Sequence, residues 1–137
     1  QLGTSWVPSW YQRRTKSFII HYMAYNGKVN AHKKWKNVDK NSDYSGSSQD
    51  QGDGFIHFST AKQVIASAYK HRKGQSNLIL LTVKSQLLGS NLKWEQSRGG
   101  QLFPHLYGNL PKKAVLKVEK LKLGKNGRHI FPKRFLK

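Results

Sequence analysis

The stretch that decides the fold is GFIHFSTA at residues 54–61. Its first half, residues 55–58, is apolar and aromatic and predicts a short strand. Alternation along that strand places Phe55 and His57 on one face and their neighbours on the other. A polar, glycine-bearing segment comes directly before it, so we expect His57 at the edge of a ligand site. A core histidine bonded to a backbone group is the alternative interpretation.

The second half of the stretch predicts the start of a helix. Ser59 or Thr60 is the expected N-cap, with Gln63 near the position of a capping partner. A helix N-terminus offers free backbone N–H groups, and the two hydroxyls add donors at the same place. We therefore expect a phosphate or pyrophosphate group of a ligand to bind there.

Outward from this stretch, the sequence predicts more strands than helices. One helix is expected over residues 61–73, ending at Gly74, and a second over residues 29–38. The strands are expected at residues 17–25, 77–83, 92–95 and 114–121. This order predicts an α+β fold with split mixed or antiparallel sheets and one or two helices.

The chain has 137 residues, which suits one domain of ordinary size. We expect that domain over residues 17–121, with an aromatic and basic arm at residues 1–16 and a basic tail at residues 122–137. Residues 39–53 have almost no apolar side chains and predict a long loop that leads into Gly54.

The charge balance points to a partner outside the candidate site. Lys and Arg total 25 against six Asp and Glu, which gives a formal net charge of +19. Such a chain attracts polyanions. RNA or the ribosome is an expected partner, through the Lys and Arg clusters at residues 13–16, 33–36 and 112–137. Solubility is the other reading of the charge. The aromatic residues of the arm are placed to stack on bases; they are Trp6, Trp10 and Tyr11.

Composition also limits chemistry and location. The chain has no cysteine, which excludes disulfides and thiolate chemistry. No apolar run approaches the roughly 20 residues that a membrane-spanning helix needs. The sequence begins at Gln1, as expected if an N-terminal segment has been removed. An intracellular location is favoured over secretion, either in the cytoplasm or, after loss of a transit peptide, in the mitochondrion.

Three further residues complete the candidate site. Glu95 follows Trp94 at a strand end, where desolvation by the ring would suit a carboxyl for acid or base work. A structural salt bridge is the alternative for Glu95. His105 and Tyr107 lie two residues apart and share a face if the segment is extended, although Tyr107 would also suit the core. No metal is expected, because the surroundings are cationic and poor in acids.

Three motifs together resemble a known family. They are GFIHFSTAKQ at residues 54–63, LKWE at residues 92–95 and FPHLYG at residues 103–108. In order and spacing they resemble the domain of unknown function 952 family, over about residues 17–121. That family in turn resembles the ADP-ribosyltransferase fold, a split α+β sheet with an NAD-sized cleft. The resemblance implies a nucleotide-shaped pocket, but a shared fold does not fix the reaction.

The resemblance also implies roles for individual residues. His21, on the first strand, would hold the cofactor. Ser59 and Thr60 would supply hydroxyls at the end of a middle strand. Glu95 would support an oxocarbenium-like centre. His21 is followed by Tyr22, where transferases of this fold often have glycine.

Three functions follow from these patterns. The first is an enzyme acting on NAD or a related nucleotide, in which Glu95, His57 and His105 are catalytic and Tyr107 contacts the ligand. The second is a basic RNA-binding or ribosome-associated protein that reuses the fold without catalysis. The third is a metal-independent ribonuclease that uses His57 and His105 as acid and base.

Overall fold

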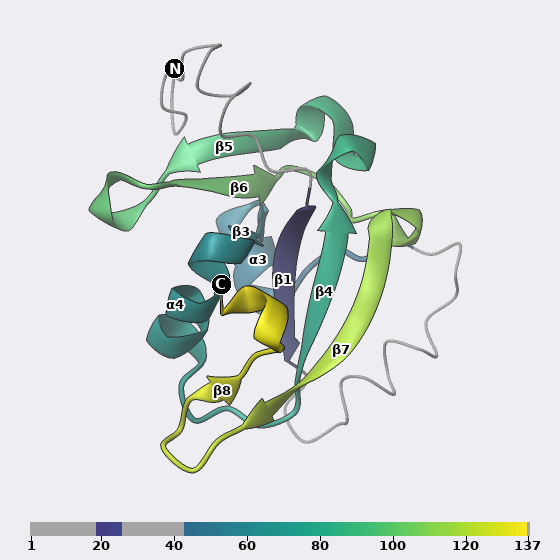
Figure 1. The fold of residues 1–137 in the computed structure, drawn as a ribbon. Coiled ribbons are helices and arrows are strands. Elements are labelled where there is room, and N and C mark those ends of the chain that lie inside the picture. The colour runs from purple at the N-terminus through teal and green to yellow at the C-terminus, as the bar shows by residue number, and fades with distance from the viewer. Residues whose placement is uncertain (1–18, 26–42, 137) are drawn as a thin grey trace.

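The computed structural model describes residues 19–25 and 43–136 and shows an α+β fold built on two antiparallel sheets (Figure 1). Within these residues the large sheet has the strand order β3-β1-β4-β7-β8, and the small sheet has the order β2-β6-β5. The strands are β1 Ile19–Tyr25, β2 Ile56–His57, β3 Ser59–Thr60, β4 Leu78–Lys84, β5 Leu92–Gln96, β6 Leu102–Leu106, β7 Val115–Leu123 and β8 His129–Ile130. The helices are α3 Ser48–Asp53 and α4 Ala61–Arg72, with short 3-10 helices η1 Ser85–Asn91, η2 Arg98–Gly100, η3 Lys112–Ala114 and η4 Lys133–Phe135.

The nearly continuous apolar run LILLTVK forms β4, the central strand of the large sheet. Both faces of this strand are covered, which is why its side chains are apolar on both sides. β1 and β7 pair with its two edges. Its side chains alternate between two cores: Leu81 and Val83 join the core beneath the small sheet, and Leu78 and Leu80 join the core beneath α4. The strand predicted from the sequence at residues 77–83 is confirmed.

Each face of the large sheet therefore has its own core. The first core includes side chains from both sheets; its most buried members are Ile20, Ile56, Phe58, Ile79, Leu81, Leu106 and Leu110. The second core lies between the large sheet, α4 and the C-terminal segment, and it contains Val64, Ala68, Leu78, Leu80, Leu121 and Phe131. Burial of this apolar area is the main source of the domain's stability.

The chain passes from one sheet to the other at Phe58. His57, on β2, lies opposite His105 of the small sheet. Only two residues later Ser59, on β3, lies opposite His21 of the large sheet. The Phe58 side chain is 2% exposed and anchors this crossing in the first core. The decisive stretch thus brings the two sheets together.

Helix α4 begins at the position expected from its sequence. Thr60 is the N-cap, and its backbone N–H donates to Gln63 Oε1 at 3.1 Å. Ser59 is instead part of β3, and its hydroxyl donates to Ser67 Oγ at 3.2 Å. The helix ends at Arg72, shortly before Gly74.

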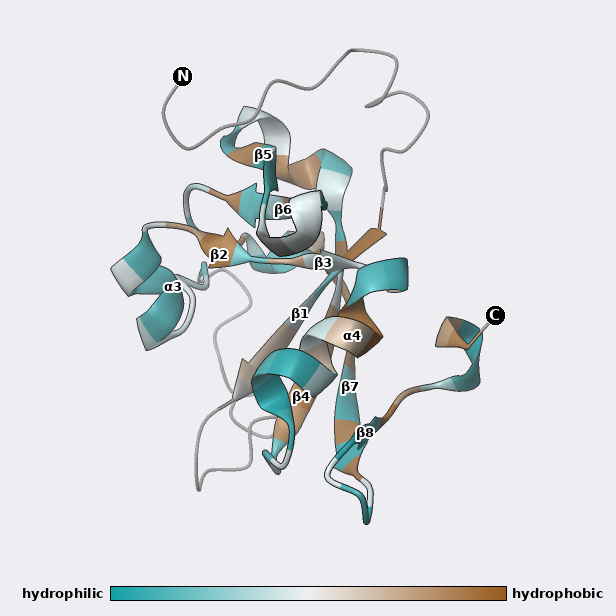
Figure 2. Ribbon diagram, turned by 90° about the vertical axis from the view of Figure 1, so that its left-hand side faces the viewer, coloured by the Kyte–Doolittle hydropathy of each residue, from teal (hydrophilic) through white to brown (hydrophobic). Residues whose placement is uncertain are grey.

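The prediction of a loop over residues 39–53 is wrong for its last part, because residues 48–53 form α3. Ser47 and Asp50 make a reciprocal capping box at the start of this helix. Gly54 closes it in the left-handed conformation, with φ of +87°, and donates its N–H to the Asp50 carbonyl at 2.9 Å. Figure 2 shows α3 in teal and near-white with no brown, so an apolar pattern could not reveal it.

The basic C-terminal residues continue the fold. β7 extends to Leu123, and β8 returns beside it. Phe131 is buried in the second core, and η4 lies over the same face of the large sheet as α4 (Figure 1). The helix expected over residues 29–38 and the arm at residues 1–16 lie outside the described residues. No helix in the described ranges is both long and apolar enough to span a membrane.

Candidate functional site

A cluster of aromatic rings lies at the outer end of the small sheet, next to α3. The Phe55 ring centroid is 4.2 Å from that of His105, 4.5 Å from that of His57 and 5.2 Å from that of Tyr107. The two imidazole centroids are 5.6 Å apart, because His57 and His105 are register partners on β2 and β6. We call Phe55, His57, His105 and Tyr107 the four-ring cluster.

Both nitrogens of the His57 ring face carboxylates from α3. The Nδ1 atom is 2.6 Å from Asp50 Oδ1, and the Nε2 atom is 3.0 Å from Asp53 Oδ2. Asp50 is 4% exposed, whereas the side chains of Asp53 and His57 are 46% and 35% exposed. His57 therefore bridges a buried carboxylate and one that solvent can reach.

Asp50 accepts hydrogen bonds through both of its carboxylate oxygens. Its Oδ2 atom accepts from the Tyr22 hydroxyl at 2.5 Å and from the Ser47 backbone N–H at 2.9 Å. Its Oδ1 atom also accepts from the His57 backbone N–H, at 3.3 Å. Burial alone would raise the pKa of Asp50, but the hydrogen bonds from His57, Tyr22 and Ser47 lower it below its usual value. Asp50 is thus held as an anion.

A second carboxylate holds the other imidazole. Glu95 Oε1 is 2.8 Å from His105 Nδ1 and accepts from the Tyr107 hydroxyl at 2.7 Å. Glu95 is 2% exposed, so a ligand at the surface would meet His105 or Tyr107 before the Glu95 carboxylate. Desolvation lowers the pKa of His105, and Glu95 only partly opposes this. Burial and the bond to Glu95 raise the pKa of Tyr107 to about 12, which keeps its hydroxyl a donor.

This geometry gives His105 the features of a base. Its ring is neutral near pH 7, and the bond from Nδ1–H to Glu95 leaves the lone pair on Nε2. A carboxylate that fixes the tautomer of an imidazole in this way is a common feature of general bases. The partial exposure of Tyr107, at 36%, shows that solvent reaches the same cluster.

The surroundings of the cluster are not poor in acids, contrary to the sequence expectation. Asp50, Asp53 and Glu95 are three of the six acidic residues in the whole chain. The difference arises because α3, which the sequence analysis treated as a loop, delivers two of them. No three His, Asp or Glu side chains within residues 19–25 and 43–136 are arranged to hold a metal ion.

The residues singled out from the sequence fall into two groups. His57, Glu95, His105 and Tyr107 meet in or directly beneath the four-ring cluster. His21, Ser59 and Thr60 belong instead to β1 and β3 of the large sheet. His21 is 3% exposed, with Thr82 Oγ1 at 3.5 Å and the Phe135 ring at 4.9 Å. It faces the second core, on the opposite side of β1 from Tyr22.

Sequence reasoning missed Asp50, Asp53, Tyr22 and the ring contacts of Phe55. The signal for Asp50 was the pattern Ser47-x-x-Asp50, a capping-box spacing directly before the FIHF strand. No local pattern links Tyr22 to a residue 28 positions later. That contact depends on tertiary structure, which brings α3 within reach of the Tyr22 side chain on β1.

The fold and the cluster together define a class: small α+β proteins with two antiparallel sheets and paired carboxylate–imidazole contacts at the end of the smaller one. The chain belongs to the family described as Protein of unknown function (DUF952), whose model matches residues 29–118. The resemblance noted from the three motifs is therefore confirmed. No curated protein matches the chain.

Solved structures of a bacterial relative show the same fold. The crystal structure of protein CC0527 from Caulobacter crescentus is 35% identical, covers 86% of this chain and 98% of its own, and has a TM-score of 0.74. The solution NMR structure of CC0527 is 37% identical, covers 82% of this chain and 91% of its own, and has a TM-score of 0.66. Both come from a structural genomics programme.

The difference between the two α3 carboxylates is testable. Asp50→Asn should lower the free energy of unfolding by about 3–5 kcal/mol, because it breaks a buried charged contact that several donors share. Asp53→Asn, which removes the exposed partner of the same imidazole, should cost about 1 kcal/mol or less. Urea denaturation of both variants measures this. Equal losses in the two variants would contradict the central role given to Asp50.

The burial of His21 predicts a pH dependence of stability. Desolvation, followed by the nearby charge of Arg134, lowers the pKa of His21 to about 4. Because the unfolded chain binds the proton near pH 6.5 and the folded chain only near pH 4, stability falls as the pH drops through that window. The loss from this group is up to about 3 kcal/mol.

We expect His21→Gln to reduce the fall in unfolding free energy between pH 7 and pH 4.5, measured by urea denaturation. His71→Gln, at an exposed position on α4, serves as the matched control and should keep the wild-type dependence. If His21→Gln leaves the pH dependence unchanged, the assigned cause is wrong.

Proposed function

We propose that the four-ring cluster and its carboxylates bind the cationic ring of NAD or a related nicotinamide nucleotide, and that the domain is ADP-ribosyltransferase-like and breaks the N-glycosidic bond of that ligand. One observation carries the proposal. In a chain of net charge +19, three of six acidic residues gather beneath and beside four aromatic or imidazole rings.

This composition favours a cation over an anion. The faces of Phe55 and Tyr107 attract positive charge, and Asp53 offers an exposed carboxylate beside them. A phosphate placed on the same cluster would meet that carboxylate and the two buried ones. The phosphates of a nucleotide would instead extend toward the surrounding Lys and Arg side chains, which make the rest of the surface positive.

The proposed reaction uses the same charges. When the C1′–N bond breaks, the nicotinamide leaves as a neutral molecule with the bonding electron pair, and positive charge develops on the ribose. Fixed carboxylates nearby stabilise that charge in the transition state. Water, or another hydroxyl acceptor, then attacks C1′ and gives its proton to His105 Nε2, while Glu95 holds the imidazole through Nδ1.

The roles proposed for the residues follow their exposure. His57, Tyr107 and Asp53 contact the ligand, because solvent reaches their side chains. Glu95 is a positioning residue for His105. Thr60, the half-buried N-cap of α4, lies just after the crossing from the small sheet and would meet the phosphate side of the nucleotide, whereas Ser59 is buried on β3. The Phe135 ring covers His21, so we assign His21 a role in packing rather than in ligand binding.

A second candidate function rests on the separation of the two imidazoles. Ring centroids 5.6 Å apart, each with Nδ1 held by a carboxylate, suit a paired acid and base that cleave a phosphodiester such as RNA. The three carboxylates repel the phosphate that this reaction requires. We therefore rank NAD-type chemistry first.

Nicotinamide release from NAD, followed by chromatography, tests the first candidate. His105→Gln should lower the rate by about 10²–10⁴-fold, as loss of a general base does. Asp53→Asn should mainly raise KM, because it removes a contact with the cationic ring. His71→Gln, which removes an exposed histidine outside the cluster, should keep wild-type activity.

Ligand binding gives an independent readout through the thermal midpoint of unfolding. NAD should raise this midpoint in the wild type and in His105→Gln, and less in Asp53→Asn. The absence of both nicotinamide release and thermal stabilisation would sink the NAD proposal. Cleavage of RNA that disappears in both His57→Gln and His105→Gln would establish the second candidate in its place.

A further inference from the structure

One end of the molecule is built from two segments that contain no acidic residue. The C-terminal half of α4 and the hairpin that joins β7 to β8 form this end (Figure 1). The sequence has no Asp or Glu over residues 54–94 and none over residues 120–137. Lys and Arg in these segments therefore meet no carboxylate of their own segment.

Backbone contacts hold the hairpin against the helix end. Gly74 donates its N–H to the Gly127 carbonyl at 2.8 Å. His129 Nε2 lies 2.7 Å from the Gln75 carbonyl. Residues more than 50 positions apart in sequence thus share one surface, and their charges are fixed side by side rather than carried on a loose tail.

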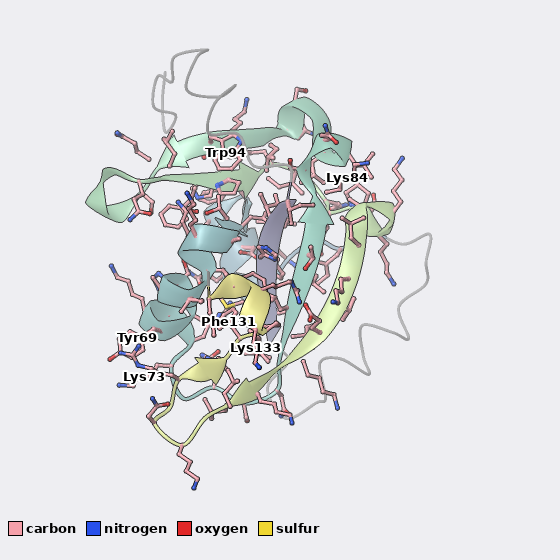
Figure 3. All side chains as sticks on the ribbon, viewed as in Figure 1. Tyr69, Lys73, Lys84, Trp94, Phe131 and Lys133 are labelled. Carbon is pink, nitrogen blue, oxygen red and sulfur yellow. The ribbon has the colours of Figure 1, made fainter. Side chains whose placement is uncertain are left out.

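We call this surface the basic patch. It consists of Tyr69, Lys70 and Arg72 from α4, Lys73 at the C-cap of that helix, and Lys125 and Arg128 from the hairpin. The Arg128 guanidinium lies 3.8 Å from the centroid of the Tyr69 ring, and Lys73 Nζ lies 4.9 Å from it. Figure 3 shows Tyr69 and Lys73 together at the end of α4. Tyr69 is 40% exposed, which is high for an aromatic side chain.

The field at the patch is positive. The hydrogen bond from Lys73, with the charges of Lys73 and Arg128, lowers the pKa of Tyr69. Cations in the last turn of a helix are favoured by the helix dipole, which accounts for those of α4. The dipole does not account for Arg128, which comes from the hairpin and adds a further positive charge over the same ring.

Another basic side chain of the C-terminal segment shows the contrast. Arg134 makes a two-pronged contact with Glu119, which Lys117 also approaches at 3.6 Å. That charge is satisfied within the protein and has a structural use. Lys73 and Arg128 of the basic patch lie over an aromatic ring instead. An external anion bound beside these two cations would lower their electrostatic free energy.

We propose that the basic patch binds single-stranded RNA, as a function separate from the reaction at the four-ring cluster. Its cations contact backbone phosphates. The Tyr69 ring and the Arg128 guanidinium form the flat, sequence-tolerant surface on which a base stacks. Binding of this kind is strongly salt-dependent, because each phosphate contact releases a counterion.

The test is fluorescence anisotropy with a labelled, unstructured RNA 20-mer at increasing salt. The double variant Lys73→Gln/Arg128→Gln removes two charges of the patch and should weaken binding by roughly tenfold at low salt. It should also reduce the slope of log K against log salt by about 1.4, the value for two lost contacts with a single strand. Lys84→Gln/Lys93→Gln removes two exposed charges elsewhere and should change affinity less than twofold.

Circular dichroism establishes that each variant is folded. If Lys73→Gln/Arg128→Gln does not fold, Lys70→Gln/Lys125→Gln is used in its place. The proposal is overturned if the wild type does not bind RNA at 50 mM salt, or if the patch and control variants lose affinity equally. Binding to phosphatidylserine vesicles is measured on the same proteins. If the patch variant loses vesicle binding but keeps RNA binding, the patch is a membrane site and the proposal is also overturned. Nicotinamide release should be unchanged in the patch variants, so this test and that of the proposed function fail independently.

Discussion

The buried carboxylate of Asp50 is the interaction on which the arrangement of the site depends. It accepts from the Tyr22 hydroxyl on the large sheet, from the Ser47 backbone at the start of α3 and from the His57 ring on the small sheet. A buried anion is tolerated only when several donors surround it. Because these donors come from different elements, the electrostatic requirement of one side chain fixes the positions of three parts of the fold.

Acidic and basic side chains are concentrated on different parts of this molecule. Half of the acidic residues of the chain lie at the four-ring cluster, while the helix end and the β7–β8 hairpin have cations alone. A net charge of +19 disfavours the compact state through self-repulsion. The carboxylates are nevertheless gathered at one site instead of being spread among the cations. They create a local negative potential beside rings that can bind a cation. The two surfaces therefore suit ligands of opposite charge.

Much of the scaffold was predictable because its signals are local. The apolar run at β4, the capping residues before α4 and the alternation that puts Phe55 and His57 on one face all follow from short-range periodicity. The proximity of His57, Glu95, His105 and Tyr107 followed from motifs. The length of α3 and the bond from Tyr22 to Asp50 did not, because a six-residue polar helix has no apolar pattern and a contact 28 residues apart depends on how the sheets meet.

The crossing at Phe58 has a consequence for how this chain tolerates change in length. Consecutive residues on either side of it are paired in different sheets, so neither strand can slide without moving the other. Inserting or deleting one residue there would invert which side chains point inward, and would place an imidazole in the core or a phenyl ring in water. We therefore expect changes in chain length to be tolerated only in connections away from this point, because residues 55–60 couple the register of one sheet to that of the other.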